Sequence, residues 1–166
     1  MIAIRRFNES DWPCVWAFLR EAFAAGDACV FAPDSKEADI HHAWVASPAA
    51  TYVAVDDGRV VGSYYLRANQ PGLGSHVCNC AYVVTPDARG QGLATLMCEH
   101  SQLEAVAMGF RAMQFNLVVM TDERALRLWQ RLGFSVVGTL PRAFHHRHFG
   151  YVDACVMYKE LVTQTD

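Results

Sequence analysis

Residues 84–94 read Val-Thr-Pro-Asp-Ala-Arg-Gly-Gln-Gly-Leu-Ala, so an apolar β-type run passes through a proline turn into the start of a helix. Gly90 and Gly92 remove Cβ atoms at a corner where a ligand could approach the backbone closely. The free N–H groups of the first helical turn and the helix dipole favour an anion there, and Arg89 adds positive charge. Because a glycine before a helix often only makes a turn, the segment indicates a pyrophosphate-binding corner only when other signals agree.

A second block supplies such a signal, because residues 121–134 read Thr-Asp-Glu-Arg-Ala-Leu-Arg-Leu-Trp-Gln-Arg-Leu-Gly-Phe. Together the two blocks resemble the GCN5-related N-acetyltransferase (GNAT) family. Arg89, Gly92 and Ala94 match its first motif, which is Arg or Gln, two residues, Gly, one residue, and Gly or Ala. The second block looks like the family's helix Asn-x-x-Ala-x-x-Leu-Tyr-x-x-Leu-Gly-Phe. The resemblance covers most of the chain, although only these two blocks are specific.

This resemblance implies an α/β fold with a mixed central β-sheet, a V-shaped splay between the fourth and fifth strands, and helices on both faces. The patterns along the chain agree with the element order β-α-α-β-β-β-α-β-α-β-β. Apolar runs predict strands at 2–7, 51–55, 60–66, 76–84, 115–119, 134–140 and 152–158. Helical spacing predicts helices over 12–23, 35–45, 93–107 and 125–132. We expect a single N-acetyltransferase domain over residues 1–166.

Two helices carry finer predictions. Ser10 or Asp11 is expected to cap the first helix, with Pro13 in its first turn. The helix after Gly92 has a predicted core-facing stripe of Leu93, Leu96, Met97, His100, Leu103 and Ala107. A histidine within such a stripe is expected to be buried and hydrogen-bonded rather than a metal ligand.

Composition excludes several classes of protein. The 166 residues include 52% hydrophobic and 19% charged residues with a net charge of −3, which indicates one compact domain without a basic stripe for nucleic acid. Neither a signal peptide nor a membrane-spanning run is recognisable, so a cytoplasmic protein without membrane contact is expected. A homodimer is compatible with the sequence, although nothing in it indicates one.

The six cysteines are scattered without a Cys-x-x-Cys pair, which favours small core side chains over a metal site or disulfides. Cys78 and Cys80 are two apart on a predicted strand, so they share one face and are badly placed for a bridge. Acetyl transfer through one of these thiols is the minority alternative.

Through the resemblance, acetyl-CoA is the expected co-substrate. Its pyrophosphate would lie on the segment made of Arg89, Gly90, Gln91, Gly92, Leu93, Ala94 and Thr95. Backbone groups of Tyr82, Val83 and Val84 would pair with the pantetheine arm, and Asp122 and Trp129 would contact the cofactor. A backbone N–H near Val84 would stabilise the oxyanion while the amine attacks the thioester directly in a ternary complex.

Two substitutions depart from the family pattern. Trp129 occupies the position of the usual tyrosine acid, and an indole N–H can donate a hydrogen bond but not a proton. Asp122 replaces the family's asparagine and brings a negative charge if ionised. Because a thiolate with a pKa of about 8.5 leaves readily, transfer without a general acid remains chemically reasonable.

A narrower resemblance concerns the acceptor. Residues 76–79, 115–119 and 151–154 look like the fungal acetyltransferases that act on azetidine-2-carboxylate, a proline analogue. This implies that Asn79, Asn116 and the neighbouring Leu117 bind the substrate, with the two amides holding its carboxylate. The alternative is that each asparagine merely ends a β-ladder or satisfies a bulge.

The run Phe-His-His-Arg-His at 144–148 suggests a metal site or an imidazole base, but a solvated loop between the last two strands is favoured and no metal is expected. His145 or His146 is a secondary candidate for general base. The leading function is an acetyl-CoA-dependent N-acetyltransferase for a small-molecule amine, an amino acid or proline analogue being the candidate. The alternatives are a protein or peptide N-acetyltransferase and a non-catalytic acyl-CoA-binding module.

Overall fold

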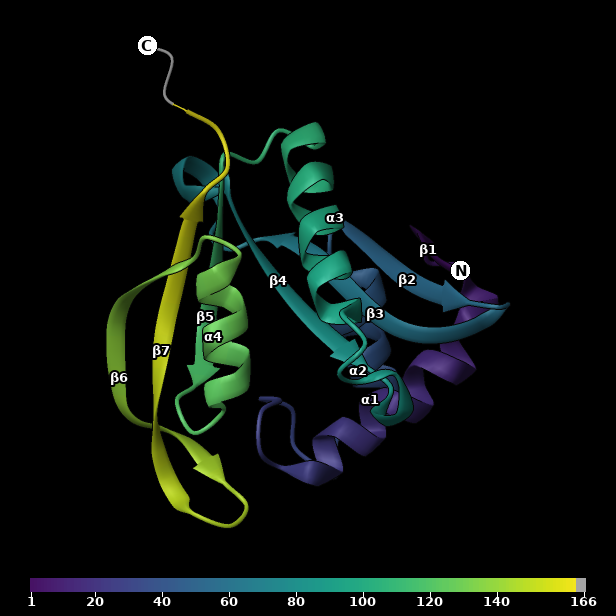
Figure 1. The fold of residues 1–166 in the computed structure, drawn as a ribbon, viewed down its shortest axis with the longest axis horizontal. Coiled ribbons are helices and arrows are strands. Elements are labelled where there is room, and N and C mark those ends of the chain that lie inside the picture. The colour runs from purple at the N-terminus through teal and green to yellow at the C-terminus, as the bar shows by residue number, and fades with distance from the viewer. Residues whose placement is uncertain (164–166) are drawn as a thin grey trace.

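The computed structural model describes residues 1–163 and contains one seven-stranded sheet with the order β1-β2-β3-β4-β5-β7-β6 (Figure 1). The strands are β1 (Ile2–Arg6), β2 (Ala50–Asp56), β3 (Arg59–Ala68), β4 (Val77–Val84), β5 (Ala112–Val119), β6 (Ser135–His146) and β7 (Gly150–Glu160). The main helices are α1 (Trp12–Ala25), α2 (Glu37–His41), α3 (Leu93–Ala107) and α4 (Glu123–Arg131). The expected element order is confirmed.

The sheet opens between β4 and β5. These two strands are parallel neighbours, and their pairing is short. Val77–Asn79 of β4 pairs with Ala112–Gln114 of β5. Beyond this point β4 stays on β3, whereas β5 stays on β7, so the two halves of the sheet diverge (Figure 1). The predicted splay between the fourth and fifth strands is therefore confirmed.

Each face of the sheet carries its own apolar core. On one face, buried residues of β2–β5 and β7 pack with α3 around Leu93 and Met97, and α4 adds partly buried residues such as Trp129. On the other face, Val15, Leu19 and Phe23 of α1 pack with Trp44 and strand residues. Helices thus cover both faces of the sheet, as predicted. The splay between β4 and β5 lies between the helix layer of α3 and α4 and the helix layer of α1. None of the helices in residues 1–163 is long and apolar enough to cross a membrane.

The start of α1 differs in detail from the prediction. Asp11 is the N-cap residue of α1 with Pro13 in the first turn, as predicted, but its side chain makes no capping bond. The capping side chain is that of Asn8, at the start of the preceding 3-10 turn, whose Oδ1 accepts the Ser10 N–H at 3.1 Å. Asp11 instead accepts the Asn8 N–H at 2.8 Å and both Nη groups of Arg5 at 2.8 Å. A short 3-10 turn (Glu9–Asp11) precedes α1, which moves the capping box upstream of the proline.

The predicted stripe of α3 is partly wrong. Leu96 and Leu103 are 43% and 73% exposed and Ala107 is exposed as well, whereas the buried positions are Leu93, Met97, Cys98, Ser101 and Ala105. The helix face that packs on the sheet is the one that carries Ser101, whose hydroxyl bonds to the Tyr82 hydroxyl at 2.6 Å. Leu96 and Leu103 therefore face away from the sheet. His100 is half-buried and its Nδ1 bonds to the Tyr64 hydroxyl at 2.6 Å, so its hydrogen bonding is confirmed.

The last two strands are longer than predicted and include the histidine run. His145 and His146 belong to β6, and His146 is buried, so the predicted solvated loop is wrong for this residue. The hairpin tip docks on the end of α1, where Arg147 donates its backbone N–H to Gly26 O at 2.9 Å and Nη1 to Ala24 O at 3.0 Å. We call this contact the strap. Within residues 1–163, the histidines form no group of metal-binding side chains.

Candidate functional site

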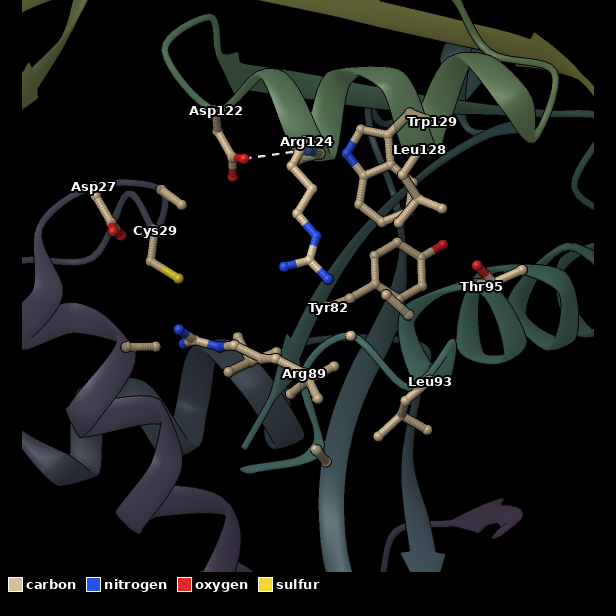
Figure 2. Close-up of a pocket in the computed structure, with 18 of the residues that line it drawn as sticks. Asp27, Cys29, Tyr82, Arg89, Leu93, Thr95, Asp122, Arg124, Leu128 and Trp129 are labelled. Carbon is tan, nitrogen blue, oxygen red and sulfur yellow. Dashed lines mark hydrogen bonds between the residues drawn. The ribbon is translucent and has the colours of Figure 1, made fainter. Parts of the chain in front are cut away.

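A cavity of about 650 Å³ lies at the open end of the splay, between the two halves of the sheet (Figure 2). It is lined by Ala22, Asp27, Ala28, Cys29, Tyr82, Val83, Val84, Ala88, Arg89, Gly90, Gly92, Leu93, Ala94, Thr95, Thr121, Asp122, Arg124, Ala125, Leu128, Trp129, Arg131 and His146. Most of the cofactor residues expected from the sequence are in this set. Its volume is typical of sites that enclose much of a small ligand.

The corner at the start of α3 has the geometry of an anion site. Gly90 and Gly92 adopt φ values of +77° and +81°, which L side chains rarely adopt, and α3 begins at Leu93. A Cβ at Gly92 would meet nothing within 4 Å, so this position faces open space. The N–H groups of the first turn therefore remain available to a ligand.

Two guanidinium groups lie at this corner, and the sequence reasoning missed one of them. Arg124, in the first turn of α4, projects into the cavity opposite Arg89 (Figure 2). Its Nη2 lies 3.2 Å from where a Cβ of Gly90 would be, so the glycine makes room for it. No carboxylate of residues 1–163 forms an ion pair with either arginine. Arg124 is at a position of the helix motif that any residue can occupy, so the motif did not identify it as a site residue.

Gln91 is the expected cofactor residue whose side chain lies elsewhere. Its Nε2 donates to Asp87 O at 2.9 Å, and it lines a small separate groove with Asp56 and Arg59. Asp87 also forms an ion pair with Arg59, which lowers the pKa of that carboxyl below its ordinary value. The side chain of Gln91 thus stabilises the turn, and only its backbone is near the corner.

Strand β4 presents backbone groups to the gap. Thr85 donates its N–H to Val61 O on the β3 side, and neighbouring residues of a strand direct their polar groups to opposite sides. The N–H and C=O groups of Tyr82 and Val84 therefore face β5, from which β4 has separated. This is the edge expected to pair with a pantetheine arm, except that Val83, which was expected to share in it, directs its N–H and C=O toward β3. It also places the N–H of Val84 at the cavity, as its assignment to the oxyanion requires.

The aromatic side chains Tyr82 and Trp129 line the cavity but offer no phenolic proton to it. Trp129 packs on Tyr82 with ring centroids 5.3 Å apart and on Phe115 at 5.0 Å. Tyr82 is the lining tyrosine among residues 1–163, but its hydroxyl points away toward Ser101 in α3 (Figure 2). Burial raises the pKa of the Tyr82 phenol well above its ordinary value. Neither aromatic group is suited to general-acid catalysis.

Asp122 has a structural role in addition to lining the cavity. It is the N-cap of α4, and its Oδ1 accepts the Ala125 N–H at 3.1 Å. Because a carboxylate at a helix N-terminus is stabilised by the free N–H groups, the replacement of the family's asparagine retains the cap. Asp122 also keeps α4, and with it Arg124 and Trp129, in place beside the cavity.

The thiols near the site are protonated at neutral pH. Burial, followed by the nearby Asp27 carboxylate, raises the pKa of Cys29 to about 11. Burial likewise raises the pKa of Cys78 to about 12, and neither Cys78 nor Cys80 lines the cavity. A thiol nucleophile needs its thiolate form, so these values disfavour transfer through a cysteine.

The expected acceptor residues lie at the vertex of the splay and not in the cavity lining. Asn79 is the last β4 residue paired with β5, and its Nδ2 donates to Gln114 O at 3.0 Å. Asn116 donates its Nδ2 to Asn69 Oδ1 at 2.7 Å and accepts from Gln114 at 3.0 Å. Leu117 follows on β5. The two amides are on neighbouring strands but do not bond to one another.

Comparisons with known proteins agree with this geometry. The model of the acetyltransferase (GNAT) family matches residues 9–134. N-acetyltransferase aca1 of Schizosaccharomyces pombe is 36% identical over 98 residues, which are 58% of this chain and 47% of that protein. The chain thus spans about half the length of this curated fungal relative.

Solved structures are similar over nearly the whole chain. A GCN5-related N-acetyltransferase from Kribbella flavida is 40% identical with a TM-score of 0.91, over 96% of this chain and 97% of that one. A phosphinothricin acetyltransferase from Sinorhizobium meliloti, solved in complex with acetyl-CoA, is 20% identical with a TM-score of 0.86, over 99% and 94% of the two chains. The second likeness shows the fold alone. Since the family model spans both sequence motifs and most of the chain, the chain belongs to the acetyltransferase (GNAT) family.

Proposed function

We propose that this chain is an acetyl-CoA-dependent N-acetyltransferase that transfers an acetyl group to a small-molecule amine by direct attack in a ternary complex. One observation carries the proposal: two positive-φ glycines, a helix N-terminus and two arginines without ion-pair partners in residues 1–163 converge where β4 and β5 separate. This corner suits a doubly charged pyrophosphate, and the adjoining strand edge suits an amide-containing arm. The residues present therefore fit acetyl-CoA.

The roles of the residues follow from their positions. Arg89, Arg124 and the first turn of α3 would hold the pyrophosphate, and the backbone of Tyr82 and Val84 would orient the arm. When bound, acetyl-CoA supplies the activated thioester. The Val84 N–H would then be available to negative charge on the acetyl oxygen, and Trp129 would pack against the bound co-substrate without supplying a proton. Holding amine and thioester together supplies much of the rate enhancement.

The strap favours a small amine over a peptide. It joins the β6–β7 hairpin to the end of α1 with one backbone and one side-chain hydrogen bond, and the cavity-lining residues Ala22 and His146 belong to these two elements. A peptide needs a groove open at both ends, which a strap at one end would obstruct, whereas an amino acid needs only a pocket. We propose that Asn79 and Asn116, with Leu117 beside them, contact the carboxylate of such an acceptor. The phosphinothricin acetyltransferase of similar fold is a relative named for a small substrate.

Thiol release from acetyl-CoA, measured against amino acids, proline analogues, polyamines and short peptides, tests the proposal. We expect turnover with a small amine and no turnover with peptides. Turnover only with peptides would replace the proposed acceptor class. Tight coenzyme A binding by calorimetry without turnover on any amine would favour the non-catalytic binding module, which the missing tyrosine makes the second candidate.

A further inference from the structure

His146 is a buried cavity residue to which the mechanism above gives no role. It is 6% exposed and lines the cavity as the last residue of β6. The cavity lining also includes Ala22, Cys29 and Val83, which belong to α1, the loop after it and the α1-facing side of β4. The pyrophosphate corner is built from other elements, namely the starts of α3 and α4. His146 therefore belongs to the acceptor side of the cavity.

The hairpin turn determines which ring nitrogen of His146 carries the proton. Nδ1 accepts two backbone N–H groups, from His148 at 3.0 Å and from Phe149 at 3.3 Å. Two donors on one nitrogen require that this nitrogen present its lone pair. The neutral ring must then be protonated at Nε2. The side chain is consequently a hydrogen-bond donor toward anything beyond the turn.

The ring is also held in place. Phe149 packs against it with centroids 4.6 Å apart, and the strap at Arg147 fixes the hairpin to α1 one residue further along. Nε2 bonds to no residue of the described chain and is not among the buried polar atoms without a partner. Nε2 is therefore the accessible ring nitrogen of this cavity-lining residue. A fixed N–H donor without a protein partner is available to an oxygen of a ligand.

We propose that His146 is a specificity-determining residue whose Nε2–H donates a hydrogen bond to a carboxylate or carbonyl oxygen of the amine substrate, and that it is not the general base. The inference rests on the proposed function and narrows its substrate class to small amines that carry such an oxygen. Taking the amine's proton would require a free lone pair, and the turn already uses the one at Nδ1. The other titratable groups lining the cavity are Asp27, Cys29, Tyr82, Arg89, Asp122, Arg124 and Arg131.

A pair of isosteric variants separates the two nitrogens. In His146→Asn the amide oxygen can still accept the N–H groups two and three residues ahead, as in an Asx turn, but the donor at Nε2 is lost. His146→Gln places its amide near the position of Nε2 instead. His145→Asn is the matched control, because His145 is exposed on the same hairpin, stacks on Tyr151 and does not line the cavity.

We expect His146→Asn to raise KM for an amino-acid acceptor about 10- to 150-fold, the range for a lost hydrogen bond to a charged group. KM for acetyl-CoA, kcat and the pH profile should be retained, and His146→Gln should restore part of the loss. An alkyl amine without an oxygen should be insensitive. An unchanged KM for the amino acid would overturn the proposal, as would loss of kcat together with one limb of the pH profile, which identifies a base.

Imidazole ¹⁵N NMR of the unliganded protein gives an independent test, with protonation at Nε2 expected at neutral pH. Protonation at Nδ1 would overturn the inference whatever the kinetics. A parent protein that acetylates no small amine would instead overturn the proposed function, and with it the role of His146. An active parent with an insensitive His146→Asn variant overturns only the present inference.

Discussion

At the scale of single residues, the anion corner depends on backbone conformation that only glycine adopts cheaply. We expect Gly92→Val to abolish measurable coenzyme A binding, because a branched side chain would occupy the open space next to the first turn of α3. The variant also carries strain, since a left-handed conformation costs an L residue roughly 1–2 kcal/mol. Isothermal calorimetry with coenzyme A measures the effect.

Gly58→Val is the matched control for that strain. Gly58 has φ +82°, close to the +81° of Gly92, also faces open space, and lies in the β2–β3 turn away from the cavity. It should lose similar stability while keeping its affinity for coenzyme A. Equal affinity in Gly92→Val and the parent would show that the phosphate does not bind at this corner.

Trp129 provides a second test at this scale. Trp129→Phe should keep kcat within about tenfold, because packing on Tyr82 and Phe115 is largely retained and the indole supplies no proton. A loss above roughly a hundredfold, with unchanged coenzyme A affinity, would mean that the indole N–H acts in the transition state. A marked gain in Trp129→Tyr would show instead that a missing acid limits the rate.

The residues of the corner illustrate what a sequence can and cannot predict. Gly90, Gly92 and Arg89 were recognisable because their chemistry follows from local order along the chain. Arg124 was not, and His146 was named only as a secondary candidate for general base, because the places of both residues in the cavity depend on the approach of α4 and of a hairpin that are distant in sequence. For Gln91, a local hydrogen bond to Asp87 directs the side chain away from the corner.

At the scale of elements, the entry into α1 is fixed by Asp11, which joins β1 to the helix through Arg5 and Asn8. The hydrogen bonds from Arg5 and the Asn8 N–H lower the pKa of this buried carboxyl below its ordinary value. A carboxyl whose folded-state pKa is depressed contributes stability above its unfolded pKa of about 3.9 and loses it as pH falls through the folded-state pKa.

We therefore expect Asp11→Asn to lower the free energy of unfolding at pH 7 by about 1–3 kcal/mol, the range for hydrogen bonds to a charged group. The difference from the parent should begin to shrink below about pH 4, where the carboxyl of the unfolded chain takes up a proton, and should vanish as pH falls through the lower pKa of the folded-state carboxyl. Urea unfolding across pH provides the measurement. Asp34→Asn, at an exposed site without an ion pair in residues 1–163, should show no such difference. A pH-independent difference would contradict the electrostatic explanation.

Element order was predictable because each strand and helix carries its own periodicity, whereas element ends and faces depended on tertiary contacts. The Leu96 and Leu103 positions of α3 have a helical spacing typical of a core face, yet the helix is rotated so that Ser101 meets Tyr82. Similarly, His145 and His146 look like loop residues by polarity. The hairpin continues through them because the strap anchors its tip.

At the scale of the whole molecule, the splay divides the sheet into β1–β4 and β5–β7, whose strands pair along a three-residue parallel ladder. The proposed cofactor and acceptor residues come from both halves, so the proposed site requires both. Asn79 belongs to one half and Asn116 to the other. A carboxylate held by both amides would bridge the halves just beyond the ladder.

If both amides hold the acceptor's carboxylate, Asn79→Ala and Asn116→Ala should each lower kcat/KM for a small amino acid by roughly 10- to 150-fold, the loss equivalent to about 1.5–3 kcal/mol. KM for acetyl-CoA should stay nearly fixed. Because the two sites share one ligand group, the double variant should lose less than the sum of the two free-energy changes. Steady-state kinetics with an amino acid and with its decarboxylated amine separate the carboxylate's contribution.

The competing explanation is that the asparagines only support the vertex through Gln114 and Asn69. Asn69→Ala is the control for it, because it removes the structural partner of Asn116 while leaving the amide in place. A structural role predicts that Asn69→Ala and Asn116→Ala lower the melting temperature alike and leave the KM of the amino acid unchanged. A binding role predicts a raised KM in Asn116→Ala only, since the Asn116 amide must exchange Asn69 for the substrate when the acceptor binds.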